Sequence, residues 1–463
     1  MKHVHGHLRF YVGTAMLLFS IIVRFMVVGI AAADTDAQVR FWTTEVERDR
    51  LAIQQEISTR FAEKTGIRVL VIPVNENFLA ARVTAAYAAR SLPDVIYHPL
   101  DFTIGWVASG ILDVSSATEV VDNLGKETFS QGPLDFVRVK GGYGAVPIDA
   151  WGQFLLYRRD LFRENALKGP DTWDRILKAA KALSDPPRMW GFEVATDPGE
   201  AYTQQVFEHF LLSNGVRLTV PPGGPERDIN LNTPEMVETL KFYKSLARFT
   251  PPGNIGWLHT RMDYLSGRAA MIIWSPFILD ELSGLRPDQP VLPDIAEKCP
   301  GFLARNTGFV NVIHGPHGSA QYGQINCLGI TSDAVSAPAR KWVEFLLGDG
   351  YMRWLGMAAE GKLPVRKGTR TEPSRFVDGW IKLDFGLTTQ ATIAGFYGMD
   401  VAKGMIAGLE GLDRWGFREG KGSLMSRVYG TKIIPRILKR FLDGELKAGQ
   451  AARMMNERLK ALE

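Results

Sequence analysis

The chain offers two acidic residues, Asp101 and Glu200, that could serve as a pair of catalytic carboxylates. Two carboxyl groups with different pKa values are the usual means of breaking a glycosidic bond. An exported enzyme acting on carbohydrate, a lyase or a glycosidase, is therefore one hypothesis. The sequence has no Gly-x-Ser-x-Gly elbow, no His-Glu-x-x-His pair and no phosphate-binding Walker loop, so other familiar hydrolytic and phosphoryl-transfer chemistries have no support.

The cysteine and histidine residues do not indicate a metal site. The two cysteines, Cys299 and Cys327, have no metal-ligand spacing with histidine. An oxidising compartment would permit a disulfide between them, and two free buried thiols are the alternative. The five histidines beyond residue 33 include no His-x-x-x-His pair. We expect neither a metal nor another cofactor.

The first part of the chain alternates strand and helix patterns. Residues 48–64 have apolar side chains four positions apart, as in a helix with one buried face, and Gly66 suits the left-handed position that ends a helix. Short apolar runs predict strands at residues 39–42, 67–72 and 94–97. This order predicts a mostly parallel α/β sheet. Ligands of such sheets bind beyond the carboxyl ends of the strands, so we expect a site in the loops after these three strands.

Later segments continue the α/β pattern. An apolar run predicts a strand at 154–157, and Thr172 is suited to cap a helix with apolar residues at helical spacing. A strand at 269–274 leads into a fourth candidate loop. The final segment, 432–462, predicts two helices broken at Gly444. No internal repeat or low-complexity linker interrupts the chain.

The N-terminus predicts export. Lys2 and Arg9 precede an apolar stretch, and Ala31 to Ala33 offer a small-residue cleavage site. An uncleaved membrane anchor is the alternative, but Arg24 near the middle of a span would be costly. We therefore expect a signal peptide at residues 1–33, cleavage near Ala33 and a periplasmic location.

Composition limits the classes of partner. Three of the 54 Lys and Arg residues lie in the first 33 positions, which leaves 51 against 50 Asp and Glu. A nucleic-acid-binding protein usually has a basic excess, so we expect no nucleic-acid partner. A chain of 463 residues with 46% hydrophobic content can build two or three domains, or two lobes, without disulfides.

A series of short motifs resembles one protein family in the right order. Residues 141–183 contain Tyr143-Gly144 followed by Pro147, then Leu156-Tyr157 with Asp160-Leu161-Phe162, and finally Pro170 before Thr172-Trp173-Asp174. Further matches are Thr65-Gly66-Ile67, Pro93-Asp94-Val95 with Ser109 to Leu112, Trp190-Gly191-Phe192, Leu211 to Gly215, Leu265 to Met271, Pro338 to Leu346, and Leu363-Pro364-Val365. The sequence resembles the family 1 extracellular solute-binding proteins, whose best-known member binds maltose.

The resemblance implies a fold and a function. The fold is α/β and two-lobed, of the periplasmic-binding-protein kind (type II-like), with discontinuous lobes, a hinge and the ligand in the cleft between them. We expect lobe 1 at 34–149 with 327–365, and lobe 2 at 150–326 with 366–463. The implied function is capture of a carbohydrate or sugar derivative and delivery to the transmembrane permease subunits of an ABC importer. From the resemblance we also expect a monomer that is not an enzyme.

The resemblance also assigns candidate ligand-binding residues on the first lobe. Asp101 falls where the family uses an aspartate to bind sugar hydroxyls, and a surface or helix-capping aspartate is the alternative. Thr44 and Glu45 stand in the first binding loop, and Asn77 in the second. Ionised carboxylates form the stronger, charge-assisted hydrogen bonds.

The other candidates belong to the hinge and to the second lobe. Glu200 and Tyr202 resemble a family Glu-Pro-Tyr contact, with a capping glutamate and a core tyrosine as the alternative. Trp274 and Ser275 precede a proline as in a family stacking motif, although Trp274 comes early and a core role is equally open. Trp151 stands at the expected lobe crossing, either as a stacking wall or as a buried hinge residue. Arg366 either reaches the cleft or is exposed.

Departures from the family pattern concern the ligand. His98, Phe102 and Glu76 replace a tryptophan, an arginine and a lysine, so the maltodextrin subsites are not reproduced. The identity of the ligand stays open among polyols, mono- and disaccharides, and sugar derivatives. A receptor for peptides or polyamines is a further alternative that would require more acidic residues in the cleft than the loop positions indicate.

Overall fold

The structure, a computed structural model, describes four stretches of the chain: residues 37–219, 228–286, 301–386 and 389–463. The expected signal peptide and Cys299 lie outside these stretches. Cys327 is a free, buried thiol. In the described part of the chain, every helix is too short or too polar to cross a membrane.

The first lobe is built on a six-stranded sheet in the order β13-β6-β12-β3-β1-β2. Its strands are β1 (Gln38–Thr43), β2 (Arg68–Pro73), β3 (Val95–Pro99), β6 (Val146–Gly152), β12 (Gly323–Ile330) and β13 (Leu363–Pro364). β1 pairs in parallel with β2 and β3, as expected, whereas β12 is antiparallel to both β3 and β6. The sheet is therefore mixed, because β12 enters it from the other lobe.

Helices cover the first sheet: α2 (Arg48–Thr65), α3 (Glu76–Ala88), α4 (Leu100–Ala108), α5 (Val114–Leu124), α15 (Ser336–Leu346) and α16 (Tyr351–Leu355). The helix expected at 48–64 is confirmed as α2, and Gly66 ends it with φ of 74°. The Trp342 ring on α15 lies 5.7 Å from that of Phe41 on β1 and 5.1 Å from that of Phe61 on α2. Aromatic contacts thus hold the start of the chain against a segment about 300 residues later.

The second lobe has a three-stranded antiparallel sheet in the order β8-β7-β9. The strands are β7 (Phe154–Arg158), β8 (Met271–Trp274) and β9 (Thr307–Val310). Around them lie α8 (Trp173–Leu183), α9 (Ala201–Ser213), α10 (Pro234–Ala247), α11 (Trp257–Leu265), α21 (Ile433–Leu442) and α22 (Ala448–Leu462). The expected cap is confirmed, since the Thr172 hydroxyl accepts a hydrogen bond from the Arg175 backbone N–H at 3.3 Å.

The remaining elements are short. The helices are α6 (Gln131–Phe136), α7 (Arg159–Glu164), α12 (Leu279–Leu282), α14 (Phe302–Asn306), α17 (Arg375–Trp380), α18 (Ile393–Tyr397), α19 (Met399–Gly408) and α20 (Gly422–Thr431), with 3₁₀ turns η1 (Lys126–Thr128), η2 (Pro276–Ile278) and η3 (Leu409–Gly411). Three two-stranded pairs are β4 (Arg138–Val139) with β5 (Gly142–Tyr143), β10 (Ile313–His314) with β11 (Ser319–Ala320), and β14 (Asp384–Phe385) with β15 (Ala391–Thr392).

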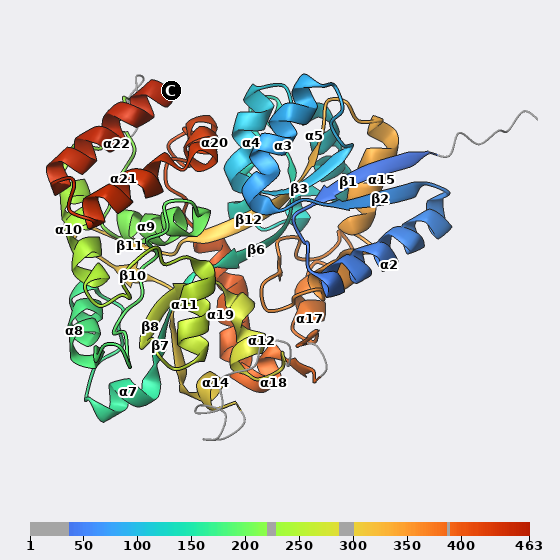
Figure 1. Cartoon of the computed structure of the whole chain (residues 1–463). Helices are drawn as coiled ribbons and strands as arrows, with labels where there is room; N and C mark the ends of the chain where they lie inside the picture. The colour runs from blue at the N-terminus through green and yellow to red at the C-terminus, as the bar shows by residue number, and fades with distance from the viewer. Residues whose placement is uncertain (1–36, 220–227, 287–300, 387–388) are drawn as a thin grey trace, which may run out of the picture.

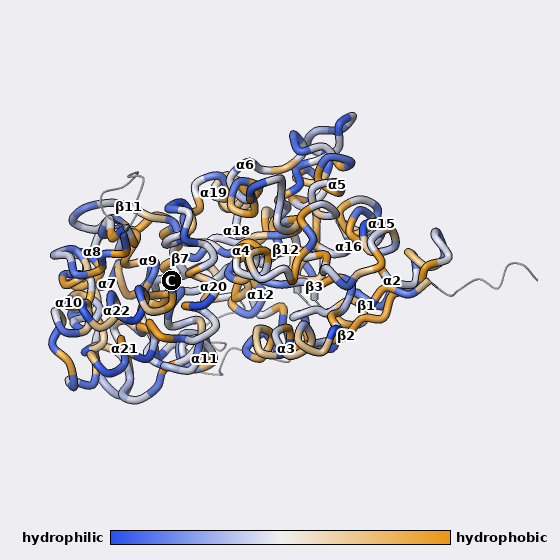
Figure 2. The backbone as a smooth tube through the Cα atoms, turned by 90° about the horizontal axis from the view of Figure 1, so that it is seen from above, coloured by the Kyte–Doolittle hydropathy of each residue, from blue (hydrophilic) through white to orange (hydrophobic). Residues whose placement is uncertain are grey.

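Two strands carry the chain between the lobes. β6 and β12 pair antiparallel, with Trp151 opposite Gln324 and Asp149 opposite Asn326. Figure 1 shows both strands running between the two groups of helices, and the view from above shows the same two groups with β12, α4 and α20 between them (Figure 2). The crossings expected at Asp149–Trp151 and near residue 326 therefore fall on paired strands.

The C-terminal segment serves both lobes, rather than the second lobe alone as expected for 366–463. α17 packs on α16 and β13, and α20 packs on α4, where the Gly105 N–H donates to the Ser426 hydroxyl at 3.1 Å. α21 and α22 lie against α9 and α10, and α20 also reaches the second lobe, where the Tyr429 hydroxyl donates to Glu208 on α9 at 2.7 Å. Sequence order could not reveal this, because α20 to α22 follow one another yet α20 packs mainly on the first lobe.

Candidate functional site

A cavity of about 350 Å³ lies between the lobes, within the range of roughly 300–1,000 Å³ for small-molecule sites. The first lobe contributes Thr44, Glu45, Glu47, Arg50, Glu76, Asn77 and Tyr97. The crossing strands and the residue between β6 and β7 contribute Trp151, Gln153, Gln324 and Asn326. The second lobe contributes Glu200, Ala201, Tyr202, Gln205, Trp257, Arg261, Trp274, Ser275, Phe277, Asp280, Glu281 and Arg286.

Most of the residues expected from the sequence line this one cavity. They are Thr44, Glu45, Asn77, Trp151, Glu200, Tyr202, Trp274 and Ser275. The positions of Thr44, Glu45, Asn77 and Ser275 follow from the loop rule, since the loops after β1, β2 and β8 all open toward the cavity. Contact of each with a ligand stays a prediction.

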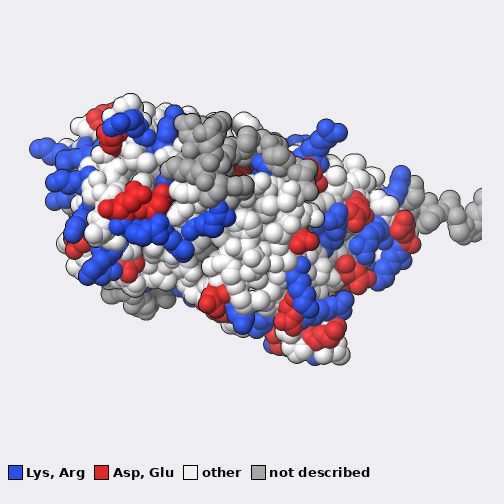
Figure 3. All heavy atoms as spheres, turned by 90° about the horizontal axis from the view of Figure 1, so that it is seen from below, with Lys and Arg blue, Asp and Glu red and all other residues white. Residues whose placement is uncertain are grey.

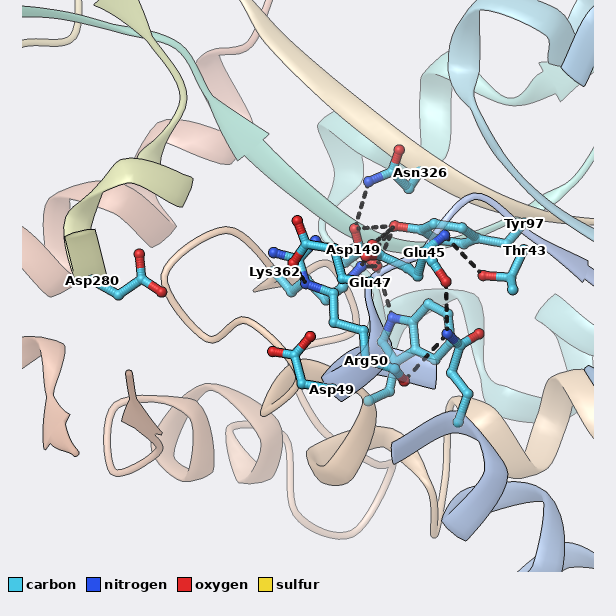
Figure 4. Close-up of polar contacts among 12 residues, drawn as sticks. Thr43, Glu45, Glu47, Asp49, Arg50, Tyr97, Asp149, Asp280, Asn326 and Lys362 are labelled. Carbon is cyan, nitrogen blue, oxygen red and sulfur yellow. Dashed lines mark hydrogen bonds and ion pairs between the residues drawn. The ribbon is translucent and has the colours of Figure 1, made fainter. Parts of the chain in front are cut away.

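A buried polar network forms the first-lobe side of the cavity (Figure 4). The Lys362 ammonium, fully buried, lies 2.5 Å from Glu45 and 3.2 Å from Asp149. Arg50 donates to the other oxygen of Glu45 at 2.8 Å. Asp149 also accepts hydrogen bonds from Tyr97, at 3.2 Å, and from the Asn326 amide, at 2.7 Å. The network therefore ties the loop after β1 to both crossing strands.

The charge state of Glu45 is set by this network. Burial alone would raise the pKa of Glu45, but the positive charges of Lys362 and Arg50 outweigh burial and lower it to about 2. Glu45 is thus an anion at neutral pH, with both oxygens held by cations. Its position is fixed before any ligand enters, which reduces the entropy lost on binding.

Aromatic side chains form the opposite wall. Tyr202, in the first turn of α9, meets Trp274 at the end of β8 edge to face, with ring centroids 5.1 Å apart. Trp257, at the start of α11, lies 6.4 Å from Trp274. The Tyr202 hydroxyl donates to the Ile273 carbonyl at 2.6 Å, so the ring offers its edge and face rather than a free hydroxyl. Trp151 adds a half-buried ring from the hinge.

Glu200 belongs to the same wall. It precedes α9, and its Oε2 accepts a hydrogen bond from the Trp257 N–H at 2.8 Å, at the N-terminus of α11. A helix N-terminus stabilises a carboxylate. Burial nevertheless raises the pKa of Glu200, so desolvation is the larger effect.

Asp101 does not line the cavity, contrary to the expectation. It lies in the first turn of α4, 2% exposed, where it forms an ion pair with Arg414 and accepts a hydrogen bond from the Gln324 amide at 2.5 Å. Arg414, itself buried, also faces Glu208 on α9 at 3.7 Å. Asp101 and Glu200 therefore do not face one cavity, as paired catalytic carboxylates would have to.

Arg366 does not reach the cavity either, and it is buried rather than exposed. Its guanidinium donates to the Leu347 carbonyl at 2.6 Å, the Leu124 carbonyl at 3.0 Å and the Thr128 hydroxyl at 3.2 Å. Leu124 ends α5 and Leu347 follows α15, so Arg366 stabilises the negative ends of two helices. Its role in the structure is to hold the first lobe together.

Several lining residues were not expected from the sequence. Trp257 and Arg261 lie four positions apart on α11, a helix whose spacing could have been recognised, and the Arg261 guanidinium lies over the Trp257 ring at 5.1 Å. Gln324 and Asn326 are two apart on β12, so they share one face of a crossing strand. Phe277 falls in the loop after β8, where a site was expected but no role was assigned to this ring.

The described residues contain no group of three His, Cys, Asp or Glu side chains that could hold a metal ion. On the face of the molecule seen from below, basic and acidic side chains lie beside one another around a broad uncharged area (Figure 3). The absence of a nucleic-acid partner stays a prediction.

Comparisons with known proteins agree with this geometry. The model of the bacterial extracellular solute-binding protein family matches residues 44–353. An ABC transporter periplasmic-binding protein of Escherichia coli, YcjN, is 30% identical over 345 residues, which cover 73% of this chain and 75% of that protein.

Solved structures share the fold. The maltose-bound MalE3 of T. maritima has a TM-score of 0.70 at 19% identity, over 92% of this chain and 100% of that one. A sugar transporter protein of Arthrobacter chlorophenolicus with bound laminaribiose has a TM-score of 0.71 at 16% identity, over 92% and 100%. The two-lobed α/β fold expected from the sequence is thereby confirmed.

Proposed function

Because this chain belongs to the bacterial extracellular solute-binding protein family, we propose that it captures a carbohydrate or sugar derivative and delivers it to the permease subunits of an ABC importer. We further propose that it is exported to the periplasm after cleavage near Ala33 and acts there as a monomer. Members of this family are binding proteins of transporters rather than enzymes.

One observation carries the proposal: acids and amides from the first lobe and the hinge face aromatic rings from the second lobe across one cavity. Aromatic faces suit the apolar C–H side of a sugar ring, and carboxylate and amide oxygens suit its hydroxyl rim. The bound sugars in the similar structures named above agree with this class of ligand.

Binding acts by shifting a conformational equilibrium. A ligand that contacts both lobes binds more tightly when the lobes are closed, so it increases the closed population. Glu45 and Asn77 hold the ligand from the first lobe, and Trp274 and Glu200 hold it from the second. The permease then recognises the relative position of the lobes.

A ligand screen tests this function. Thermal unfolding of the purified mature chain is measured with a panel of mono- and disaccharides, polyols and amino derivatives, and the hits are confirmed by calorimetry. We expect a raised unfolding temperature with one class and recovery of the sugar unchanged after long incubation. Conversion of the bound sugar into a product would contradict a receptor function.

A further inference from the structure

The cavity wall has more acidic than basic side chains. Six carboxylates line it, Glu45, Glu47, Glu76, Glu200, Asp280 and Glu281, against three guanidinium groups, Arg50, Arg261 and Arg286. The loop positions alone did not indicate this excess, because Asp280 and Glu281 come from the short helix α12 beyond the loop after β8.

Each of the three guanidinium groups already has a carboxylate partner. The pairs are Arg50 with Glu45 at 2.8 Å, Arg261 with Glu281 at 3.0 Å, and Arg286 with Asp280 at 3.6 Å. An anionic ligand would have to displace a protein carboxylate from its arginine. The cavity is therefore unsuited to uronic acids and sugar phosphates.

Glu76 and Glu200 have no basic partner within hydrogen-bonding distance among the described residues. Glu76 lies in the first turn of α3, on the first lobe, and Glu200 lies across the cavity on the second. Lys432 lines a narrow side pocket with Glu76 and makes an ion pair with neither carboxylate in the described part of the chain.

Buried acceptors on the cavity wall also lack donors. Gln153 Oε1 and Glu281 Oε2 belong to side chains that are 1% and 4% exposed, and both side chains line the cavity. Neither oxygen has a hydrogen-bond partner among the residues that the structure describes. An unsatisfied buried acceptor costs about 1–3 kcal/mol. A ligand rich in N–H and O–H donors would satisfy them.

The pKa values agree with a local excess of negative charge. Desolvation between the lobes, followed by the charges of Asp101 and Glu45, raises the pKa of Glu76 to about 7, although its side chain keeps contact with solvent. Burial likewise raises the pKa of Glu281 to about 7, and neighbouring Asp280 adds to the shift. A cationic ligand would relieve this repulsion.

We propose that the ligand is a sugar or polyol derivative bearing an amino group that is protonated at neutral pH. The inference rests on the proposed function and narrows its ligand class. The ammonium lies between Glu76 on the first lobe and Glu200 across the cavity on the second, and forms charge-assisted hydrogen bonds with them. The indole faces of Trp257 and Trp274 add cation–π attraction, while the remaining hydroxyls meet Gln153 and Glu281.

Matched pairs of probes test the ligand class. Calorimetry on the mature chain compares D-glucosamine with D-glucose and N-acetylglucosamine, and 1-amino-1-deoxy-D-glucitol with D-glucitol, with putrescine as an amine without a sugar. We expect the amine of at least one pair to bind tenfold or more tightly than its neutral partner. Its affinity should fall from pH 7 to pH 5, as Glu76, with a pKa of about 7, takes up a proton. The titratable and charged groups that face Glu76 and Glu200 are Asp101, Glu45, Asp197, His259 and Lys432.

Two variants locate the ammonium. Glu76→Gln and Glu200→Gln should each weaken amine binding about tenfold and leave the neutral partner within threefold. Glu63→Gln, an exposed change on α2 outside the cavity, should alter neither.

The outcomes separate the inference from the function on which it rests. Equal or tighter binding of the neutral partners would overturn the amine inference and leave carbohydrate capture standing. Binding of putrescine but of no sugar or polyol would overturn both, as would binding of none of the probes at 10 mM (about the weakest affinity that calorimetry resolves).

Discussion

The guanidinium of Arg414 is ion-paired with the carboxylate of Asp101, and both groups are buried between the lobes. Arg414 comes from the loop before α20 and Asp101 from the first turn of α4. Arg414 also donates to Gln324 at 2.6 Å and faces Glu208 at 3.7 Å. One cation thus joins the first lobe, a crossing strand and the second lobe behind the cavity.

Replacing Arg414 with Met should destabilise the protein strongly. Asp101 and Glu208 would remain buried without a cation, and breaking a buried ion pair from one side costs about 3–5 kcal/mol. Urea unfolding followed by tryptophan fluorescence measures the change in the free energy of unfolding.

Arg418 provides the control for this experiment. It lies four residues later in the same loop, half-exposed, and pairs with Asp413 at 3.1 Å. Arg418→Met should cost no more than about 1 kcal/mol, as for other surface pairs. If Arg414→Met behaved like this control, the buried network would not be a stabilising connection between the lobes.

This ion pair also shows how far the sequence could predict the site. The position of Asp101 just after β3 follows from local pattern, and so do the positions of Glu45 after β1 and Ser275 after β8. The contacts of Asp101 do not follow from local pattern, because its partner Arg414 is 313 residues away in the chain. The sequence identified the loops correctly but could not tell a ligand-facing acid from a neutralised one.

The same limit applies to the fold. Strands β1 to β3 and helix α2 were predictable because strand and helix periodicities are local. The sharing of the C-terminal segment between lobes depends on packing of α20 against α4, which includes the close contact of Gly105 with Ser426. This contact forms because Gly105 has no side chain. A single sequence does not show which surface packs against that glycine.

Trp151→Ala should weaken ligand binding about tenfold, which corresponds to about 1.4 kcal/mol. The half-buried ring lines the cavity from the hinge strand β6, and its removal takes apolar contact from the ligand. Calorimetry with the best ligand of the screen gives the affinity, and circular dichroism checks that the fold is retained. Trp151→Phe should recover part of the loss. An affinity within twofold of wild type for Trp151→Ala would exclude the ring from the site.

Lys362→Met should make stability depend differently on pH. In the wild type the folded-state pKa of Glu45 is about 2, below the usual value of about 4.5. The associated stabilisation is complete above pH 4.5 and is lost as the pH falls toward 2. Without Lys362, Glu45 and Asp149 lose the cation between them, so the variant should be less stable at pH 7 and the difference should shrink at pH 3. Unfolding temperatures at pH 7, 5 and 3 test this, and a difference that stays constant with pH would contradict it.

Glu193→Gln should stabilise the protein in alkaline solution. Glu193 is fully buried in the second lobe, and burial, followed by the nearby carboxylate of Asp263, raises its pKa to about 10. Folding at neutral pH therefore takes up a proton, and the wild type loses stability as the pH rises from about 4.5 toward 10. A glutamine is neutral without taking up that proton. Urea unfolding should show nearly equal stability at pH 5 and an advantage of about 1–3 kcal/mol for the variant at pH 8. Parallel pH profiles for wild type and variant would mean that Glu193 is ionised in the folded protein.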